Sequence, residues 1–213
     1  MVLMRVISSI YSILIKLSNA IQRWRFRPQY PVDKSDWFDR AVQIVLEHEG
    51  KLNINDKDRG GATKYGISLR YLQLVDLDLN KDGKVDVEDI FCVSQAIATN
   101  IYRKDWWDRY KYHEINDFAI AAKVFDLAVN MGATQAHKLL QVVINRLSPH
   151  SLNIDGVLGS KTLYALNQMI DDSKAIDILE GFKTAATSFY KELVINDSEL
   201  EIFEKGWLRR VNS

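Results

Sequence analysis

From Ser35 to the C-terminus, apolar residues recur every three or four positions, and almost no segment alternates with a period of two. The first pattern is typical of amphipathic helices, and the scarcity of the second leaves little room for a sheet. A chain of 213 residues that is 47% hydrophobic can bury a substantial core with such helices. We therefore predict a mainly α fold with a short β-hairpin or irregular loop at 51–67. The helices are expected at 36–49 with Ser35 as N-cap, at 68–75 with Ser68 as N-cap, and at 86–104, 117–130, 133–147, 160–170, 174–194 and 199–210.

Residues 2–22 have their own helical pattern, with apolar residues on one side and Arg5, Lys16 and small polar residues on the other. The longest uncharged run, Val6 to Ile15, is shorter than the roughly 20 residues that span a bilayer. A cleaved leader is disfavoured because Lys16 interrupts the apolar run. Two interpretations stay open: a basic helix on a membrane surface, or a helix that docks on the domain or on a partner helix.

The charges of the chain balance, with 28 basic and 28 acidic residues. We therefore expect no nucleic-acid partner. The single cysteine, Cys92, excludes an internal disulfide. We expect Cys92 to be a small buried apolar residue.

Glu49 lies one turn after Val45 and continues the apolar side of the helix predicted at 36–49. Gly50 is expected to end this helix as a C-cap. Partial burial and the negative end of the helix dipole both disfavour a charged carboxylate at this place. A carboxyl group that keeps its proton near neutral pH can protonate a glycosidic oxygen. Glu49 is thus a candidate general acid, and a glutamate that merely ends a helix and pairs with a Lys or Arg is the alternative.

The segment after Glu49 adds Asp56, Asp58 and Thr63 around a Gly60-Gly61 turn. Two facing carboxyls are the usual requirement for glycoside hydrolysis. A water held between Asp58 and Thr63 would give an inverting arrangement with carboxyls about 6.5–9.5 Å apart, whereas about 5–5.5 Å would indicate a retaining one. The spacing leaves this choice open, and a solvated acidic turn remains the alternative for both aspartates.

These residues resemble the signature of the glycoside hydrolase family 108 N-acetylmuramidases, also called secretion-activator lysozymes. That signature is a Glu-Gly-Gly at a helix end followed by Asp-x-Gly-Gly-x-Thr-x-Tyr/Phe-Gly-Ile, matched here by Glu49-Gly50 and by "DRGGATKYGI" at 58–67, with Lys51 in place of the second glycine. The resemblance implies a lysozyme-like helical domain in which Glu49, Asp58 and Thr63 are catalytic. It also implies cleavage of the β-1,4 bond between N-acetylmuramic acid and N-acetylglucosamine in peptidoglycan glycan strands, in the periplasm or cell wall. Phage lysis, secretion of another protein and wall remodelling all remain open as its purpose.

Three further segments are similar to this family: "IYRKDWWDRY" at 101–110, "FDLAVNMG" at 125–132, and "NIDGVLGSKTLYAL" at 153–166. The last is similar to a turn in the family's C-terminal peptidoglycan-binding helical domain. The resemblance suggests three regions: an N-terminal helix and linker at 1–32, a muramidase region at 33–115 and a helical peptidoglycan-binding region at 116–213. Core packing is the alternative for each of the residues expected to bind sugar by stacking or hydrogen bonding, which are Tyr65, Tyr102, Trp107, Asp126 and Asn130.

The segment "DLNKDGKVDVED" fits the pattern of a calcium-binding loop, with Gly83 at the sharp turn. Position 12 is an aspartate instead of the usual bidentate glutamate, and a solvated acidic turn is the alternative. Bound calcium would stabilise the loop and have no part in catalysis. The expected ligands are Asp78, Asn80, Asp82, the Lys84 carbonyl, Asp86 and Asp89.

Two functions of other classes compete with hydrolysis. A non-catalytic peptidoglycan-binding protein would hold glycan with the same residues. A calcium-regulated membrane-associated adaptor would use the helix at 2–22 and the acidic loop, but it leaves the Glu49-to-Thr63 pattern without a purpose.

Overall fold

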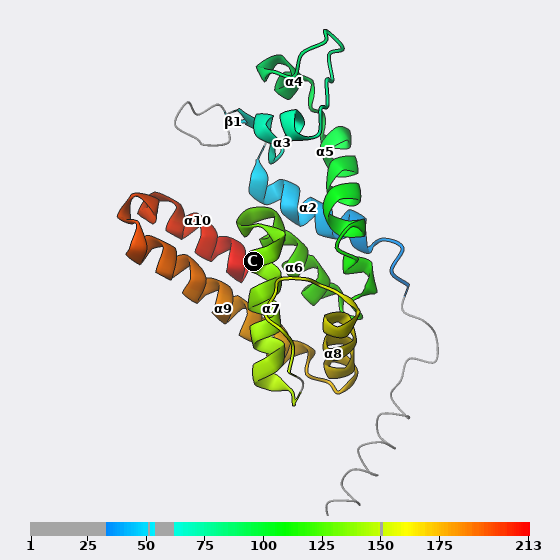
Figure 1. Cartoon of the computed structure of the whole chain (residues 1–213), viewed down its shortest axis with the longest axis vertical. Helices are drawn as coiled ribbons and strands as arrows, with labels where there is room; N and C mark the ends of the chain where they lie inside the picture. Colours follow the sequence, from blue (N-terminus) through cyan, green and yellow to red (C-terminus); the bar gives the residue numbers. More distant parts are fainter. Residues whose placement is uncertain (1–32, 51, 54–61, 150) are drawn as a thin grey trace, which may run out of the picture.

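The structure, a computed structural model, describes residues 33–50, 52–53, 62–149 and 151–213 (Figure 1). The predictions for 1–32, including the amphipathic helix at 2–22, lie outside the described residues, as do those for Asp56 and Asp58.

The described part of the chain is mainly helical, as predicted. Its one sheet is small and antiparallel, in the order β1-β2-β3, with strands β1 (Leu52–Asn53), β2 (Thr63–Lys64) and β3 (Ile67–Ser68). The helices are α2 (Trp37–Glu49), α3 (Leu69–Leu74), α4 (Val87–Cys92), α5 (Gln95–Tyr102), α6 (Phe118–Met131), α7 (Ala133–Leu147), α8 (Ser160–Asp171), α9 (Ala175–Asn196) and α10 (Glu201–Asn212). Shorter helical segments lie at Arg103–Asp108 (a π-helix), Tyr112–Glu114 and Ser198–Leu200.

The prediction of a single helix at 86–104 is wrong, because two helices cover this segment. α4 ends at Cys92, Val93 is extended, and Ser94 begins α5 by accepting a hydrogen bond from the Ile97 amide. The buried Val93 side chain and the Ser94 cap together favour the break over a continuous helix.

Three smaller predictions have mixed outcomes. Ser68 does cap its helix, since its hydroxyl accepts from the Tyr71 amide. Ser35 does not cap α2, because the N-cap is Asp36, which makes no side-chain cap bond. Cys92, the last residue of the short helix α4, is exposed instead of buried.

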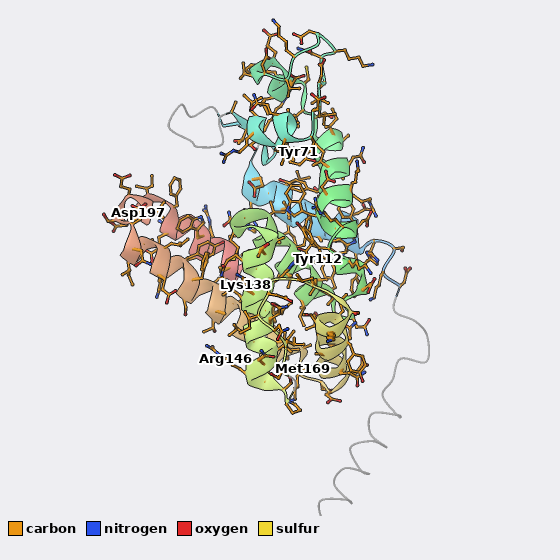
Figure 2. All side chains as sticks on the ribbon, in the orientation of Figure 1. Tyr71, Tyr112, Lys138, Arg146, Met169 and Asp197 are labelled. Carbon is orange, nitrogen blue, oxygen red and sulfur yellow. The ribbon has the colours of Figure 1, made fainter. Side chains whose placement is uncertain are left out.

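α6 is the central helix of the molecule and contacts α2, α7, α9 and α10. α9 and α10 run side by side as a hairpin, and the C-terminus of α10 returns to the middle of the molecule (Figure 1). The small sheet, α3 and α4 form the part at the top of Figure 1, beyond the end of α2. Tyr71 on α3, labelled in Figure 2, ties this part to the π-helical segment by donating its hydroxyl to the Asp105 carboxylate.

One hydrophobic core runs through the described residues from Trp37 to Val211. It crosses the boundary predicted near residue 116, because the ring of Phe38 on α2 packs against that of Phe125 on α6. Tyr112, labelled in Figure 2, is fully buried at this junction and contacts the ring of Phe125. The two predicted regions therefore share one core.

The turn at Asp155-Gly156 is held by polar side chains of α7. Gln141 donates to the Asp155 carboxylate at 2.8 Å, and Gly156 has a φ of +78°. A Cβ on Gly156 would lie 2.6 Å from the Thr134 carbonyl oxygen, so only glycine fits. These contacts account for the motif structurally, without a ligand.

Among the helices that the structure describes, none is long and apolar enough to cross a membrane.

Candidate active site

Glu49 is the last residue of α2, and its side chain is 20% exposed. Val45 and Leu46 on the preceding turn are buried in the core, so Glu49 continues the buried side of the helix, as predicted. Gly50 ends the helix at a φ of 72°, with its amide donating to the Leu46 carbonyl at 3.3 Å. The Glu49 carboxyl is thus held at the rim of the core, where one side remains open to solvent.

A tight hairpin turn packs against Glu49. Tyr65 and Gly66 connect β2 to β3 with φ angles of 52° and 77°, the left-handed pair expected of a two-residue type I′ turn. A Cβ on Gly66 would lie 2.7 Å from Glu49 Cγ and would overlap the Tyr102 hydroxyl, which itself donates to the Tyr65 carbonyl at 3.0 Å. The absence of a side chain at Gly66 therefore lets the turn approach the carboxyl directly.

The charged partner of Glu49 comes from the other end of the chain. Arg210 on α10 donates from Nη1 to Glu49 Oε1 at 2.7 Å, and only 6% of its side chain is exposed. The pairing of Glu49 with a basic residue, left open as an alternative, is therefore present. Sequence reasoning missed Arg210, because 161 positions separate the two residues and no local motif marks it.

Asp126 on α6 anchors the other side of Arg210. Its Oδ1 accepts from Arg210 Nε at 2.9 Å and from His48 Nδ1 at 3.1 Å, while Lys123 Nζ lies 3.7 Å from Oδ2. Within the described residues, Oδ2 accepts no hydrogen bond. The buried Asp126 carboxylate is thus compensated by a cluster of basic groups and does not face solvent.

The cluster keeps Arg210 charged. Burial alone would lower the pKa of its guanidinium, but Asp126 and then Glu49 outweigh burial, and the pKa is raised. For Lys123 the balance is opposite: burial lowers its pKa, and Asp126 offsets that effect only in part. A positive charge next to the Glu49 carboxyl is consequently a permanent feature of the site.

The predicted sugar contacts of Tyr102, Trp107 and Asp126 are wrong, because all three side chains are buried. Trp107 packs edge-on against Phe38 and Phe125 in the core, at centroid distances of 5.8 and 5.5 Å. The core-packing alternative is correct for both rings, and Asp126 belongs to the Arg210 cluster.

The remaining predicted residues have accessible or undescribed side chains. Tyr65 is half-buried at the hairpin turn, and Thr63 is half-buried on β2, in the same small sheet. Asn130 is also half-buried, and its Oδ1 accepts from the Tyr190 hydroxyl at 2.5 Å. The sheet thus brings Thr63 to the same end of α2 as Glu49, whereas Asp58 lies outside the described residues.

The predicted calcium loop is held by its own hydrogen bonds. Asp78 accepts from the amides of Lys81 at 2.5 Å and Gly83 at 2.8 Å, and Gly83 makes the expected sharp turn at a φ of +88°. Asp89 is fully buried and accepts from the backbone amides of Leu79, Asn80 and Asp86. These backbone hydrogen bonds lower the pKa of Asp89, and the bond from the Asp86 amide has the largest effect.

The same loop does not gather side chains around one point. No group of three or more His, Cys, Asp or Glu residues in the described ranges is placed to hold a metal ion. Calcium binding by Asp78, Asn80, Asp82, Asp86, Asp89 and the Lys84 carbonyl therefore stays a prediction, and no step of the chemistry below depends on it.

A partly buried glutamate at a helix end, with a tight β-hairpin against it in an otherwise helical molecule, defines the class as a mainly α, lysozyme-like fold. Residues 42–132 match the family model described as glycosyl hydrolase 108. The match includes Glu49, the hairpin turn and Asp126, and it ends at the close of α6.

One solved structure to which the chain is similar is that of SagA from Brucella abortus, at 28% sequence identity and a TM-score of 0.65. The similarity covers 82% of this chain and 89% of the SagA chain. No curated protein sequence matches this chain. The family match and the similar fold together support a function of the peptidoglycan-hydrolase type.

Proposed function

We propose that this protein is an N-acetylmuramidase that cleaves the β-1,4 bond between N-acetylmuramic acid and N-acetylglucosamine, with Glu49 as its general acid. The observation that carries this proposal is the placement of Glu49. Its carboxyl is partly buried at the end of α2, lies against the Gly66 turn and sits inside the segment that matches glycosyl hydrolase 108.

The contacts of Glu49 suggest different roles for its two carboxyl oxygens. Oε1 accepts a hydrogen bond from Arg210 Nη1 at 2.7 Å. We assign proton transfer to the glycosidic oxygen to the other oxygen of the carboxyl, Oε2. The carboxyl has to donate that proton while it remains next to Arg210.

Asp58 and Thr63 complete the proposal by the family resemblance. They would hold the water that attacks the anomeric carbon from the opposite side of the sugar ring, which inverts the configuration. If Asp58 instead attacks the carbon itself, a covalent glycosyl-enzyme forms and the configuration is retained. The half-buried position of Thr63 on β2 supports its share in this role.

Glu49→Gln tests the function directly. The amide cannot supply the proton, so clearing of purified sacculi should fall by about 10²–10⁴-fold, the usual contribution of a general acid. Sacculus pull-down should be unchanged, because the side chain keeps its shape. Glu47→Gln is the matched control: this residue is exposed on the same helix and should retain full activity.

Two outcomes would contradict the proposal. Full clearing by Glu49→Gln would remove Glu49 from the acid's role, and wild-type binding without any cleavage would favour a non-catalytic peptidoglycan-binding protein. Mass spectrometry of the products identifies the bond, and nuclear magnetic resonance of the fresh products identifies the anomer and hence the mechanism. Since peptidoglycan lies outside the inner membrane, we propose that the protein acts in the periplasm or cell wall.

A further inference from the structure

The contact between Arg210 and Glu49 joins two parts of the chain that the family match separates. Glu49 lies within the matched segment at 42–132, whereas α10 lies outside it. Arg210 is nevertheless the closest charged partner of the carboxyl among the described residues, at 2.7 Å, and is almost completely buried. A surface ion pair would contribute little, but a buried arginine in direct contact with a carboxylate restricts its geometry strongly.

The guanidinium of Arg210 is itself fixed from several sides. Its Nε donates to Asp126 Oδ1 at 2.9 Å, and its Nη2 donates to the Asp126 backbone carbonyl at 3.1 Å. Lys123 donates to the carbonyl of Arg210 at 2.8 Å and so holds the helix end in place. The remaining arm of this planar fork, Nη1, points at Glu49 Oε1. Residues of α6 therefore fix the orientation of the Arg210 guanidinium, and the guanidinium fixes the orientation of the Glu49 carboxyl.

The other ionisable groups around Glu49 cannot replace this contact. His48 Nδ1 contacts Asp126 Oδ1 at 3.1 Å, Lys123 Nζ donates to the Arg210 carbonyl, and the Asp126 carboxylate repels a second carboxylate. Tyr102 and Tyr190 are buried phenols whose pKa values are raised, chiefly by burial, so they stay neutral. Arg210 is thus the cation that holds the Glu49 carboxyl in place.

We propose that Arg210 is a positioning residue of the catalytic acid: it holds Glu49 Oε1 so that Oε2 faces the glycosidic oxygen, and it makes α10 a part of the active site. This inference rests on the proposed function of Glu49. It does not give Arg210 contact with the sugar. It adds that the region after residue 132 is needed for the chemical step as well as for any binding of glycan.

Arg210→Gln and Arg210→Lys in the full chain test the proposal, with Arg209→Gln as the matched control, since Arg209 is an exposed arginine next to it on the same helix. Asp126→Asn combined with Arg210→Gln removes both buried charges together and keeps a foldable variant if the single change leaves Asp126 unpaired. Rates of product release from sacculi are measured from pH 4 to pH 9, and folding of each variant is checked by circular dichroism.

Both Arg210→Gln variants should lose about 10- to 100-fold in kcat with little change in KM, as expected when a reacting group is misplaced. Removal of the cation beside the carboxyl should also change the alkaline limb of the pH profile. Arg210→Lys keeps the positive charge, so the alkaline limb of its pH profile should stay near the wild-type position, whereas its kcat should be reduced. Folded Arg210→Gln variants with wild-type kcat and an unmoved limb would overturn the proposal.

A measurement without activity separates this inference from the proposed function. In a double-mutant cycle of Glu49→Gln and Arg210→Gln, thermal unfolding should show that the two changes are not additive. If the effects of the two substitutions on thermal stability are additive, the positioning role of Arg210 is overturned, whatever the activity of the variants. Coupled residues in a protein that cleaves no glycan would overturn the proposed function and, with it, the role of Arg210 in catalysis.

Discussion

At the scale of single residues, Gly66 shows how one missing side chain shapes the site. Its φ of +77° and its approach to Glu49 and Tyr102 both exclude a Cβ. Glycine is therefore required at position 66 for two reasons: the hairpin turn needs a left-handed backbone, and the turn packs too closely against Glu49 to leave room for a side chain.

Gly66→Ala should consequently lower both stability and activity. The left-handed backbone and the overlap with Tyr102 are expected to reduce the free energy of unfolding by about 2–4 kcal/mol. Glu49 should be displaced, with a lower kcat at temperatures where the variant remains folded. Gly206→Ala on α10 is the control, since nothing lies within 4 Å of its added Cβ and alanine in a helix should raise stability by about 1 kcal/mol. Equal effects of the two substitutions, measured by urea unfolding, would contradict this account.

His137 is a second residue whose surroundings predict a measurable effect. It is buried between the Tyr112 hydroxyl at 2.9 Å and the Gly156 carbonyl at 3.0 Å, and burial lowers its pKa from the ordinary 6.5. The unfolded chain therefore binds a proton at His137 at a higher pH than the folded protein does. This part of the stability is complete above about pH 6.5 and is lost as the pH falls through the lower pKa of the folded state.

The free energy of unfolding should thus decrease below pH 6.5 with a slope of at most about 1.4 kcal/mol per pH unit from this group. His137→Gln should remove that part of the slope and cost about 1–3 kcal/mol at pH 7 through weakened hydrogen bonds. His113→Gln serves as control because His113 is exposed. An unchanged slope in His137→Gln, measured by urea unfolding from pH 5 to pH 7.5, would assign the pH dependence to other groups.

At the scale of elements, helical spacing predicted α2, α3 and the C-terminal helices well, because each has a continuous apolar side. It failed at 86–104, where a hydroxyl cap at Ser94 interrupts an apolar pattern that continues across the break.

The active site could likewise be predicted only where its residues are close in the sequence. Glu49 and Thr63 belong to one local motif, whereas Arg210 joins them only through the packing of α10 on α6. Aromatic residues at 102–107 are equally compatible with a groove or a core until α6 is placed beneath them.

The loop between α3 and α4 carries the calcium prediction. Its sharp turn at Gly83 and the acidic side chains at Asp78 and Asp82 fit the motif, although they do not converge in the described structure. Calcium added to the full chain should release or absorb heat in a titration and raise the melting temperature. At a concentration 100 times the dissociation constant, the expected stabilisation is about 2.7 kcal/mol.

Asp78→Asn combined with Asp82→Asn should abolish the calcium response. Glu88→Gln, an exposed acid of the same segment that is not an expected ligand, should leave it intact. A titration with no heat and no thermal shift would show that backbone amides alone hold this loop.

At the scale of the whole molecule, the continuous core argues against two independent folding units. Side chains of α2 and α6 pack ring against ring across the boundary near residue 116, and Arg210 joins α10 to both helices by hydrogen bonds. Calorimetry of the full chain should therefore show a single transition for the described core, with equal calorimetric and van't Hoff enthalpies.

A substitution far from Glu49 should then shift the unfolding of the entire core. Ile178 on α9 is fully buried, so Ile178→Ala is expected to cost about 2–5 kcal/mol and to lower the melting temperature by about 4–20 °C. Activity against sacculi should be lost at the same lower temperature, because Arg210 leaves the site when α9 and α10 unfold. Ile176→Ala, at a position that is 77% exposed on the same helix, should change little. Two separate transitions, with only the later part of the chain affected by Ile178→Ala, would show that the catalytic region folds by itself and that α10 docks onto it as a distinct unit.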